Sequence, residues 1–464
     1  MKKIVFLLVT LLVSSGALLA ADEHAGVFPP PLLAFSAAKE QQVRALATNL
    51  HLTVSPEING FFKSAARGDY TVVTNTIARL AVEYVASYKN PAKLPAWCPF
   101  WQPMTEVESA YTAFATGGTK YPLAFGQGII RSIPAGSIYF GGTDAGRGLV
   151  TALCESHAQA RPFYTLTQNA LSDGRYMDYL RAMYVKWVYL PTTNDVQHTI
   201  EEYRADALVR LKHDEAFPAG PRQIQLGEQV RMVDGKLEME GPVSVMAIHA
   251  RLVKLILDHN PNRDLFMEES YPLDLINPHL TPHGLIFKLN HEPLPALTAK
   301  IMEDDHAFWA KQCAAMLGGW LKPDTSVSNV CAFVETVYLK KDYSHFTGDR
   351  EFVTNEFATK SFSKLRSSIA GLYQWRLTEM PGNDDKARLR AAADFGYRQA
   401  FALCPSSQEA IYRYINFLLA QGRCDDAIAI AGAALKLNQD NQQLKILLPQ
   451  LQDFRDQQSR LKTH

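Results

Sequence analysis

The sequence lacks the short motifs that mark the best-known nucleotide-binding and hydrolytic sites. It contains neither GxGxxG nor GxxxxGK[ST], the glycine-rich loops of dinucleotide-binding and P-loop proteins. GxSxG and HExxH, the motifs of α/β-hydrolases and zinc peptidases, are also missing. No cysteine or serine nucleophile stands in a recognisable setting, so the motifs give no support for an enzyme.

The chain also has little net charge and no clustered cysteines. Its 47 basic and 47 acidic side chains give no electrostatic reason to expect nucleic acid or an anionic membrane as partner. The six cysteines are scattered, without CxxC or metal-ligand spacing, and predict no metal site. An exported protein can oxidise its cysteines, so buried thiols and disulfides both stay open.

A long apolar run occurs only at the N-terminus. Lys2 and Lys3 precede IVFLLVTLLV, and small residues lead to ALLA, which ends at Ala20. This pattern predicts a signal peptide over residues 1–20, because about ten apolar residues are too few for the roughly 20 of a membrane span. The alternative is an uncleaved anchor. We expect a periplasmic or secreted protein, attached to the envelope or free, with no transmembrane span in the mature chain.

The length of 464 residues exceeds what a single hydrophobic core usually supports. Changes of pattern divide the rest of the chain into three regions, and the first, over residues 37–130, is helical. Ser55-Pro56-Glu57 is a typical helix start. A break at Gly68-Asp69 precedes a second amphipathic helix with Val73, Ile77, Leu80 and Tyr84 on one face. This part of the region therefore predicts a helical hairpin.

Between residues 131 and 295 strands and helices alternate. SIYFGG and PFYTLTQ read as strands, and each is followed by a helical segment, RGLVTALCESHAQ and DGRYMDYLRAMY. EQVRMVDGKLEME predicts a hairpin that turns at Asp234-Gly235. RDLFMEES and GLIFKLN complete the strands. The alternation predicts an α/β domain with a mostly parallel sheet and flanking helices.

Residues 296–464 read as helix throughout, and residues 408–441 fill one 34-residue window. Its first helix presents Ile411, Tyr414 and Leu418, Gly422 makes the turn, and the second helix has a face of alanines. This pattern is typical of a tetratricopeptide repeat. The preceding residues give a second, interrupted repeat. Such helices pack on their neighbours or bind a partner protein.

The glycine-rich stretch SIYFGGTDAGRG has two interpretations. A strand, a loop and a helix N-terminus with the cation of Arg147 offer an anion site made by Gly142, Thr143, Asp144, Gly146 and Arg147. The Asp144 carboxylate would repel a phosphate there unless a cation bridged the two. In the second interpretation Thr143 or Asp144 caps the helix and Arg147 pairs with a carboxylate.

The loop after the second strand contributes Asn169 and Asp173. In a parallel sheet the loops at the carboxyl ends of neighbouring strands share one crevice, so both side chains are expected near Asp144 and Arg147. Capping of the next helix by Asp173 is an equal alternative. If the crevice is catalytic, Asp144, Arg147 and Asp173 are the residues that would act.

A metal site is not predicted. Glu268, Glu269, His279 and His283 stand near strand ends, and carboxylates with histidines can bind metal. However, Thr281-Pro282 separates the histidines, and neighbouring carboxylates on a strand point to opposite faces. His249 lies in the apolar face of its helix and is expected to be a core residue. The sequence calls for no cofactor.

Three stretches together resemble a known family. They are residues 134–180, residues 263–290 and the repeat-bearing tail, and in this order they resemble the soluble region of the protein O-mannosyltransferase-like membrane proteins grouped as glycosyltransferase family 117. Gly142-Thr143-Asp144 matches the acidic first loop of that family, and Arg161-Pro162-Phe163-Tyr164 opens the next strand. The tail of that family also carries tetratricopeptide-like helices, and the chain is similar, too, to exported tetratricopeptide-repeat proteins of Verrucomicrobia-type bacteria.

The resemblance implies a soluble module and not the activity, because the family's catalytic membrane bundle is missing from this sequence. We therefore predict an exported, non-catalytic binding or scaffold protein. Its tetratricopeptide-like helices would hold a protein partner, and its α/β cleft would hold a glycan, a lipid-linked sugar or another anionic ligand. The alternative is a soluble sugar-processing enzyme related to glycosyltransferases.

Overall fold

The computed structural model describes residues 28–89, 94–142, 145–154, 163–268, 273–379 and 386–463. The signal peptide predicted for residues 1–20 lies outside these ranges. The chain forms two compact units. The first comprises Met1–Thr119, Ile130–His279 and Lys288–Pro293, and the second comprises Lys120–Ile129, Leu280–Phe287 and Leu294–His464. Across the described ranges, no helix combines the length and apolarity that a bilayer crossing requires.

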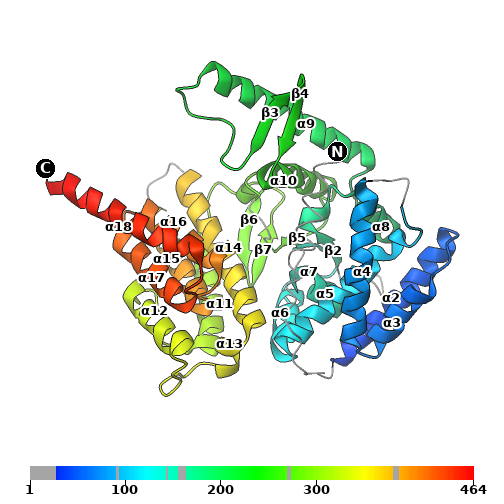
Figure 1. Ribbon diagram of the computed structural model, residues 1–464, viewed down its shortest axis with the longest axis horizontal. Helices are drawn as coiled ribbons and strands as arrows, with labels where there is room; N and C mark the ends of the chain where they lie inside the picture. Colours follow the sequence, from blue (N-terminus) through cyan, green and yellow to red (C-terminus); the bar gives the residue numbers. More distant parts are fainter. Residues whose placement is uncertain are drawn as a thin grey trace. The chain divides into compact units, whose positions relative to one another are not determined.

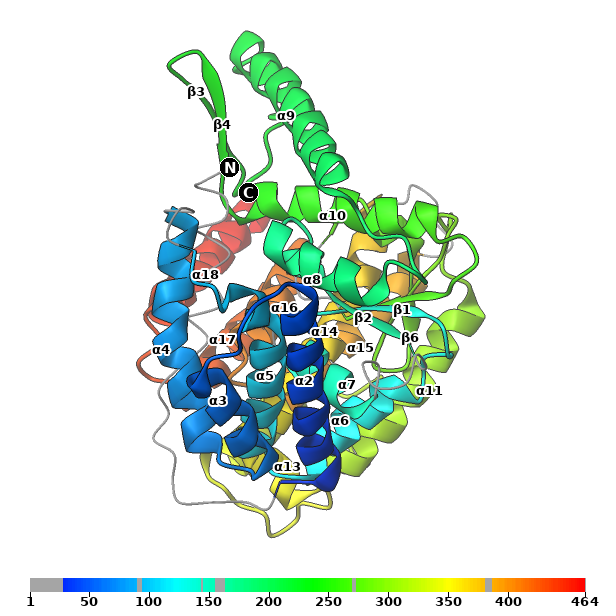
Figure 2. The same cartoon turned by 90° about the vertical axis from the view of Figure 1, so that its right-hand side faces the viewer.

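The first unit begins with a group of packed helices (Figure 2). They are α2 (Pro30–Asn49), α3 (Pro56–Ala66), α4 (Tyr70–Lys89) and α5 (Trp101–Gly117), with the short η2 (Cys98–Phe100) before α5. Ser55 caps α3 as predicted, since its Oγ accepts a hydrogen bond from the N–H of Ile58 at 3.3 Å. Gly68 has a φ of 80° and allows the turn into α4, which confirms the helical hairpin.

The strands of the main sheet stand in the order β2-β1-β5-β7-β6. They are β1 (Ile138–Gly141), β2 (Tyr164–Thr167), β5 (Leu265–Met267), β6 (Leu280–His283) and β7 (Ile286–Leu289). β1 pairs in parallel with both β2 and β5, and all four of its residues are buried, as expected for a strand covered on both faces.

The prediction of a mostly parallel sheet needs correction. Only Gly284 and Leu285 separate β6 from β7, and parallel strands cannot be joined by so short a connection. The sheet is therefore mixed. The strand β6 was missed because its sequence LTPH contains a proline and has no run of β-branched or aromatic residues.

Helices and a hairpin connect these strands within the first unit. They are α7 (Ala145–Leu153), η3 (Gln168–Ala170), α8 (Gly174–Tyr184), α9 (Thr193–Ala216), α10 (Pro242–His259) and η4 (Asn277–His279). The hairpin of β3 (Gln229–Val233) and β4 (Lys236–Glu240) lies beside α9 (Figure 1). Asp234 and Gly235 have φ values of 50° and 73°, as a two-residue hairpin turn requires. The predicted hairpin is confirmed.

The second unit is helical apart from β6 and part of β7. It contains α6 (Lys120–Ile130), α11 (Ala299–Leu317), α12 (Val327–Phe333), η5 (Val334–Leu339), α13 (Arg350–Thr354), α14 (Glu356–Glu379), α15 (Lys386–Leu403), α16 (Gln408–Ala420), α17 (Cys424–Leu437) and α18 (Gln442–Thr463). Ile411, Tyr414 and Leu418 are buried as the repeat pattern predicts, and Gly422 turns with a φ of 71°. The predicted helical C-terminal region is confirmed.

Candidate functional site

The carboxyl ends of three parallel strands meet at one edge of the sheet. Gly141, the last residue of β1, pairs with Thr167 of β2. On the other side of β1, Phe140 pairs with Met267 of β5, which Glu268 follows. This is the edge at which open α/β sheets usually bind their ligands, so it is the first candidate site.

Arg147 in α7 is the central cation of this edge, and both terminal nitrogens of its guanidinium donate hydrogen bonds to protein groups. Its Nη2 donates a hydrogen bond to Glu106 Oε1 of α5 at 2.8 Å, and its Nη1 donates to Thr167 Oγ1. The guanidinium carbon also lies 5.5 Å from the centre of the Tyr176 ring, within the range of a cation–π contact. Arg147 therefore links α5, α7, α8 and β2.

The second oxygen of Glu106 serves two further buried groups. Lys39 Nζ of α2 forms an ion pair with Glu106 Oε2, and the Tyr179 hydroxyl donates to the same oxygen at 2.8 Å. Lys39 Nζ also donates to the Tyr179 oxygen at 2.9 Å. Burial lowers the pKa of Lys39, while Glu106 opposes this shift. We call Lys39, Glu106, Arg147 and Tyr179 the buried charge cluster.

The two cations of the cluster, Lys39 and Arg147, depend on the Glu106 carboxylate for their charge balance. The charge cluster holds two cations for one carboxylate, and Lys39 and Glu106 are 0% and 2% exposed. A buried charge is strongly destabilising unless it is paired and hydrogen-bonded. The four residues come from helices far apart in the sequence, so the cluster joins the N-terminal helices to the sheet edge.

The glycine-rich loop makes a close approach to a buried carboxylate. A Cβ added at Gly146 would overlap the carboxylate of Glu268, so any other residue at position 146 would force this buried carboxylate to move. The Tyr139 hydroxyl donates to the carbonyl oxygen of Gly146 at 3.2 Å and lies 3.3 Å from Glu268 Oε2. Gly142 is buried beside this contact, while Thr143 and Asp144 lie outside the described residues.

The two predicted residues of the next loop have different positions. Asn169 is 4% exposed within η3, close in sequence to the Thr167 that binds Arg147. Asp173 is the N-cap of α8, where its Oδ1 accepts from the N–H groups of Arg175 at 2.9 Å and Tyr176 at 3.4 Å. The capping interpretation of Asp173 is therefore correct. Its carboxylate stabilises the helix start.

A serine–histidine pair lies in the same unit. Ser172 Oγ is 2.9 Å from His249 Nε2 of α10, a distance suited to nucleophile activation. However, burial lowers the pKa of His249 to about 3, so the ring resists the proton that a general base must take. Its Nδ1 has no hydrogen-bond partner among the described residues. This arrangement fits a core histidine rather than a catalytic one.

The histidines and cysteines form no metal centre in the described ranges. His279 Nδ1 lies 2.9 Å from the carbonyl oxygen of Asn290, and Glu269 lies outside the described residues. No group of three or more histidine, cysteine, aspartate or glutamate side chains in these ranges could hold an ion. All six cysteines are free thiols.

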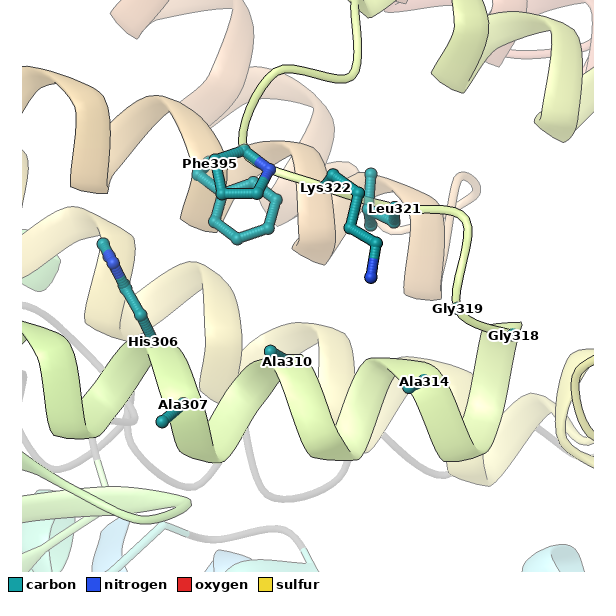
Figure 3. A pocket seen from close by; sticks show the side chains of 10 residues that line it. His306, Ala307, Ala310, Ala314, Gly318, Gly319, Leu321, Lys322 and Phe395 are labelled. Atoms are coloured by element: carbon teal, nitrogen blue, oxygen red, sulfur yellow. The ribbon is translucent and has the colours of Figure 1, made fainter.

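The helical second unit contains a pocket of about 260 Å³ (Figure 3). It lies between α11, the following loop and α15. Its lining residues are His306, Ala307, Ala310, Ala314, Gly318, Gly319, Leu321, Lys322, Pro323 and Phe395. Lys322 is exposed, and no carboxylate of the described residues forms an ion pair with it. No sequence motif predicted this pocket, because its lining joins parts of the chain separated by more than 70 residues.

Comparison with known proteins finds no match to this chain among family models, curated proteins or solved structures. The resemblance to glycosyltransferase family 117 therefore stays a prediction from the residues quoted above. The candidate sites are thus of two kinds. One is a sheet edge whose cation is paired internally, and the other is an open pocket whose cation forms no ion pair with any described carboxylate.

Proposed function

We propose that this protein is an exported, non-catalytic binding protein that holds its partner on the helical second unit. The observation that carries the proposal is the pocket on α11, where Lys322 offers a positive charge that no described carboxylate neutralises. Export rests on the signal-like N-terminus. A protein partner is the occupant that helical-repeat surfaces commonly accept.

The proposal includes the tetratricopeptide-like character of α14 to α17. Supporting it, Ala427, Ala431 and Ala434 of α17 are at most 1% exposed, as the close packing of paired repeat helices requires. Tyr414 of α16 stacks on Tyr397 of α15 with ring centres 5.8 Å apart. These contacts stabilise a continuous stack of helices and leave its outer faces for binding.

We assign the buried charge cluster at the sheet edge a structural role within this function. Both terminal nitrogens of Arg147 already donate to Glu106 and Thr167, so an anionic ligand would compete with these partners for the guanidinium. Arg147 and Asp173 were two of the three residues of the sugar-processing alternative, and both serve the fold. A glycan at this edge would depend on Thr143 and Asp144 instead.

Site-specific photo-crosslinking tests the proposed function. A photoreactive residue would replace Ala310 on the pocket floor, Ala315 on the same helix outside the pocket, or the exposed Glu201 of α9 in the first unit. We expect Ala310 to crosslink one envelope protein, identified by mass spectrometry, with competition by unlabelled protein. Equal crosslinking from Glu201, or none from Ala310, would contradict the proposal.

A further inference from the structure

We propose that the pocket on α11 binds a carboxylate carried on a compact apolar group, with Lys322 as the partner of the carboxylate. This inference rests on the proposed function, since it names the chemistry that the binding unit recognises. The apolar lining of the pocket, its small volume and its single positive charge support the proposal.

The body of the pocket is apolar. Ala307, Ala310 and Ala314 lie one turn apart on α11 and form its floor (Figure 3). Opposite them, the pocket is walled by Leu321 and Phe395, which are 7% and 4% exposed. Such a surface gains free energy when an apolar group displaces water from it, and the alanines leave room for that group.

The pocket is too small for a large ligand. Its volume of about 260 Å³ lies below the roughly 300–1,000 Å³ of pockets that enclose drug-sized molecules. A dry cavity of about 150 Å³ is enough for benzene. The pocket therefore fits one aromatic ring or branched aliphatic group with a short polar extension, which is the size of one large amino-acid side chain.

The charge of the lining selects an anion. Lys322 is the only lysine or arginine among the ten lining residues, and none of the ten is acidic. Figure 3 shows its side chain reaching from the loop toward α11, over the alanine floor. An ammonium group beside an apolar surface strengthens a hydrogen bond to a carboxylate, because such charge-assisted bonds are stronger than neutral ones.

His306 adds a polar group at one end of the pocket without adding charge. Burial lowers its pKa, and the nearby Arg366 cation lowers it further while Asp305 opposes the shift. The ring is held edge-on against Phe395 and Tyr373, with centres 6.1 Å and 6.3 Å away. Its Nε2 is buried and has no hydrogen-bond partner within the described ranges, so the ring closes this end of the pocket as an uncharged group.

Two sources can supply this chemistry, a free carboxylic acid or the C-terminal residue of a polypeptide. Isothermal titration distinguishes them with four probes: 3-phenylpropionate, its amide, and acetyl-Gly-Phe with a free or an amidated C-terminus. In either case we expect the acid to bind at least about tenfold more tightly than the matched amide, the ratio that one charge-assisted hydrogen bond provides.

The variants locate the effect. Lys322→Met should abolish the preference for the acid over the amide. Ala310→Leu should weaken the binding of both the acid and the amide, because the larger side chain fills the pocket. Ala315→Leu, on the same helix but outside the lining, is the matched control and should change neither affinity. Binding of acetyl-Gly-Phe as tight as that of 3-phenylpropionate identifies a chain end as the ligand, and binding of 3-phenylpropionate alone identifies a free acid.

Equal affinities for acid and amide, an unchanged preference in Lys322→Met, or no binding of any probe would overturn the inference. These outcomes are separate from failure of the proposed function. The crosslinking experiment detects a partner on the second unit whatever its chemistry, whereas the titrations test only whether the pocket selects an apolar carboxylate. Circular dichroism on each variant confirms that a lost affinity does not reflect unfolding.

Discussion

Arg147 and Glu106 form a largely buried ion pair, with Nη2 of the arginine 2.8 Å from Oε1 of the glutamate, and the two residues stand 41 positions apart in the sequence. The pair decides how the glycine-rich stretch is interpreted. A cation that looks available for a ligand in the sequence is held in place by a carboxylate from the N-terminal helices. The sheet edge is thereby part of the core of its unit.

The two partners of this ion pair should differ in their effect on stability. Glu106→Gln leaves Lys39 and Arg147 buried without a counter-charge, and we expect it to lower the free energy of unfolding by about 3–5 kcal/mol. Arg147→Met leaves Glu106 paired with Lys39, so the loss should be smaller, about 1–3 kcal/mol. Chemical denaturation measures both.

The control for this comparison is Arg231→Met in the β3–β4 hairpin, where the arginine side chain is 61% exposed and pairs with Glu238. Exposed ion pairs contribute about 0–1 kcal/mol, so the variant should be close to wild type. If Glu106→Gln were no more destabilising than Arg231→Met, the charge cluster could not have the structural role given to it.

Gly146→Ala should destabilise the protein, because its Cβ would overlap the buried Glu268 carboxylate. A buried, hydrogen-bonded side chain cannot move aside cheaply, and we expect a loss of about 1–3 kcal/mol in thermal or chemical unfolding. Gly174→Ala at the start of α8 is the matched control, since nothing lies within 4 Å of its added Cβ. Two variants of equal stability would contradict the described approach of Gly146 to Glu268.

His249 should make the protein less stable in acid. Burial lowers its pKa from the ordinary 6.5 to about 3 in the folded state, so between these values the unfolded chain binds the proton and the folded chain does not. Stability from this residue is present above pH 6.5 and falls as the pH decreases, by about 1.4 kcal/mol per pH unit.

Replacement of the imidazole by an amide removes this titration while keeping a group that can bond Ser172. The unfolding free energy of His249→Gln, measured from pH 7 to pH 4, should therefore vary less steeply than that of wild type. His198→Gln, whose side chain is 73% exposed in wild type, serves as control and should keep the wild-type slope. A His249→Gln slope identical to wild type would show that the ring is not excluded from protonation.

Ser172 should not behave as a catalytic nucleophile. Activation would place the Ser172 proton on His249 Nε2, and the low pKa of that ring opposes the transfer. We expect a fluorophosphonate probe to leave Ser172 unmodified under conditions that label a serine hydrolase added as positive control. Labelling that disappears in Ser172→Ala would contradict this and indicate a serine hydrolase.

Local signals in the sequence predicted much of the fold. The Ser55 cap, the Asp234-Gly235 turn and the helical face of Val73, Leu80 and Tyr84 each depend on neighbours within about one or two turns. The structure confirms them because short-range hydrogen bonds and periodic burial act in the same direction there. For the same reason the helices after residue 408 were predicted with their correct turn at Gly422.

Contacts between distant residues could not be predicted. The carboxylate that pairs with Arg147 comes from α5, and Lys39 stands 67 positions from Glu106. Helix and strand periodicities relate only residues close in sequence, so they cannot predict such a contact. The helix α6 lies in the region that was predicted to be helical, but its place in the second unit was missed. Its Tyr121 and Phe125 pack there on Phe352 and Phe362. Its burial depends on residues more than 200 positions away, and a single sequence contains no signal for that contact.

The most direct test of the account is the affinity of the crosslinked partner for three forms of the protein, measured by isothermal titration. They are wild type, Ala310→Leu in the pocket of the second unit, and Asp173→Ser, which keeps a helix cap at the sheet edge of the first unit. We expect Ala310→Leu to bind the partner at least tenfold more weakly, a loss of about 1.4 kcal/mol of binding free energy. We expect Asp173→Ser to bind it with the wild-type affinity. Full affinity in Ala310→Leu with loss in Asp173→Ser would contradict the account and return the binding site to the sheet edge.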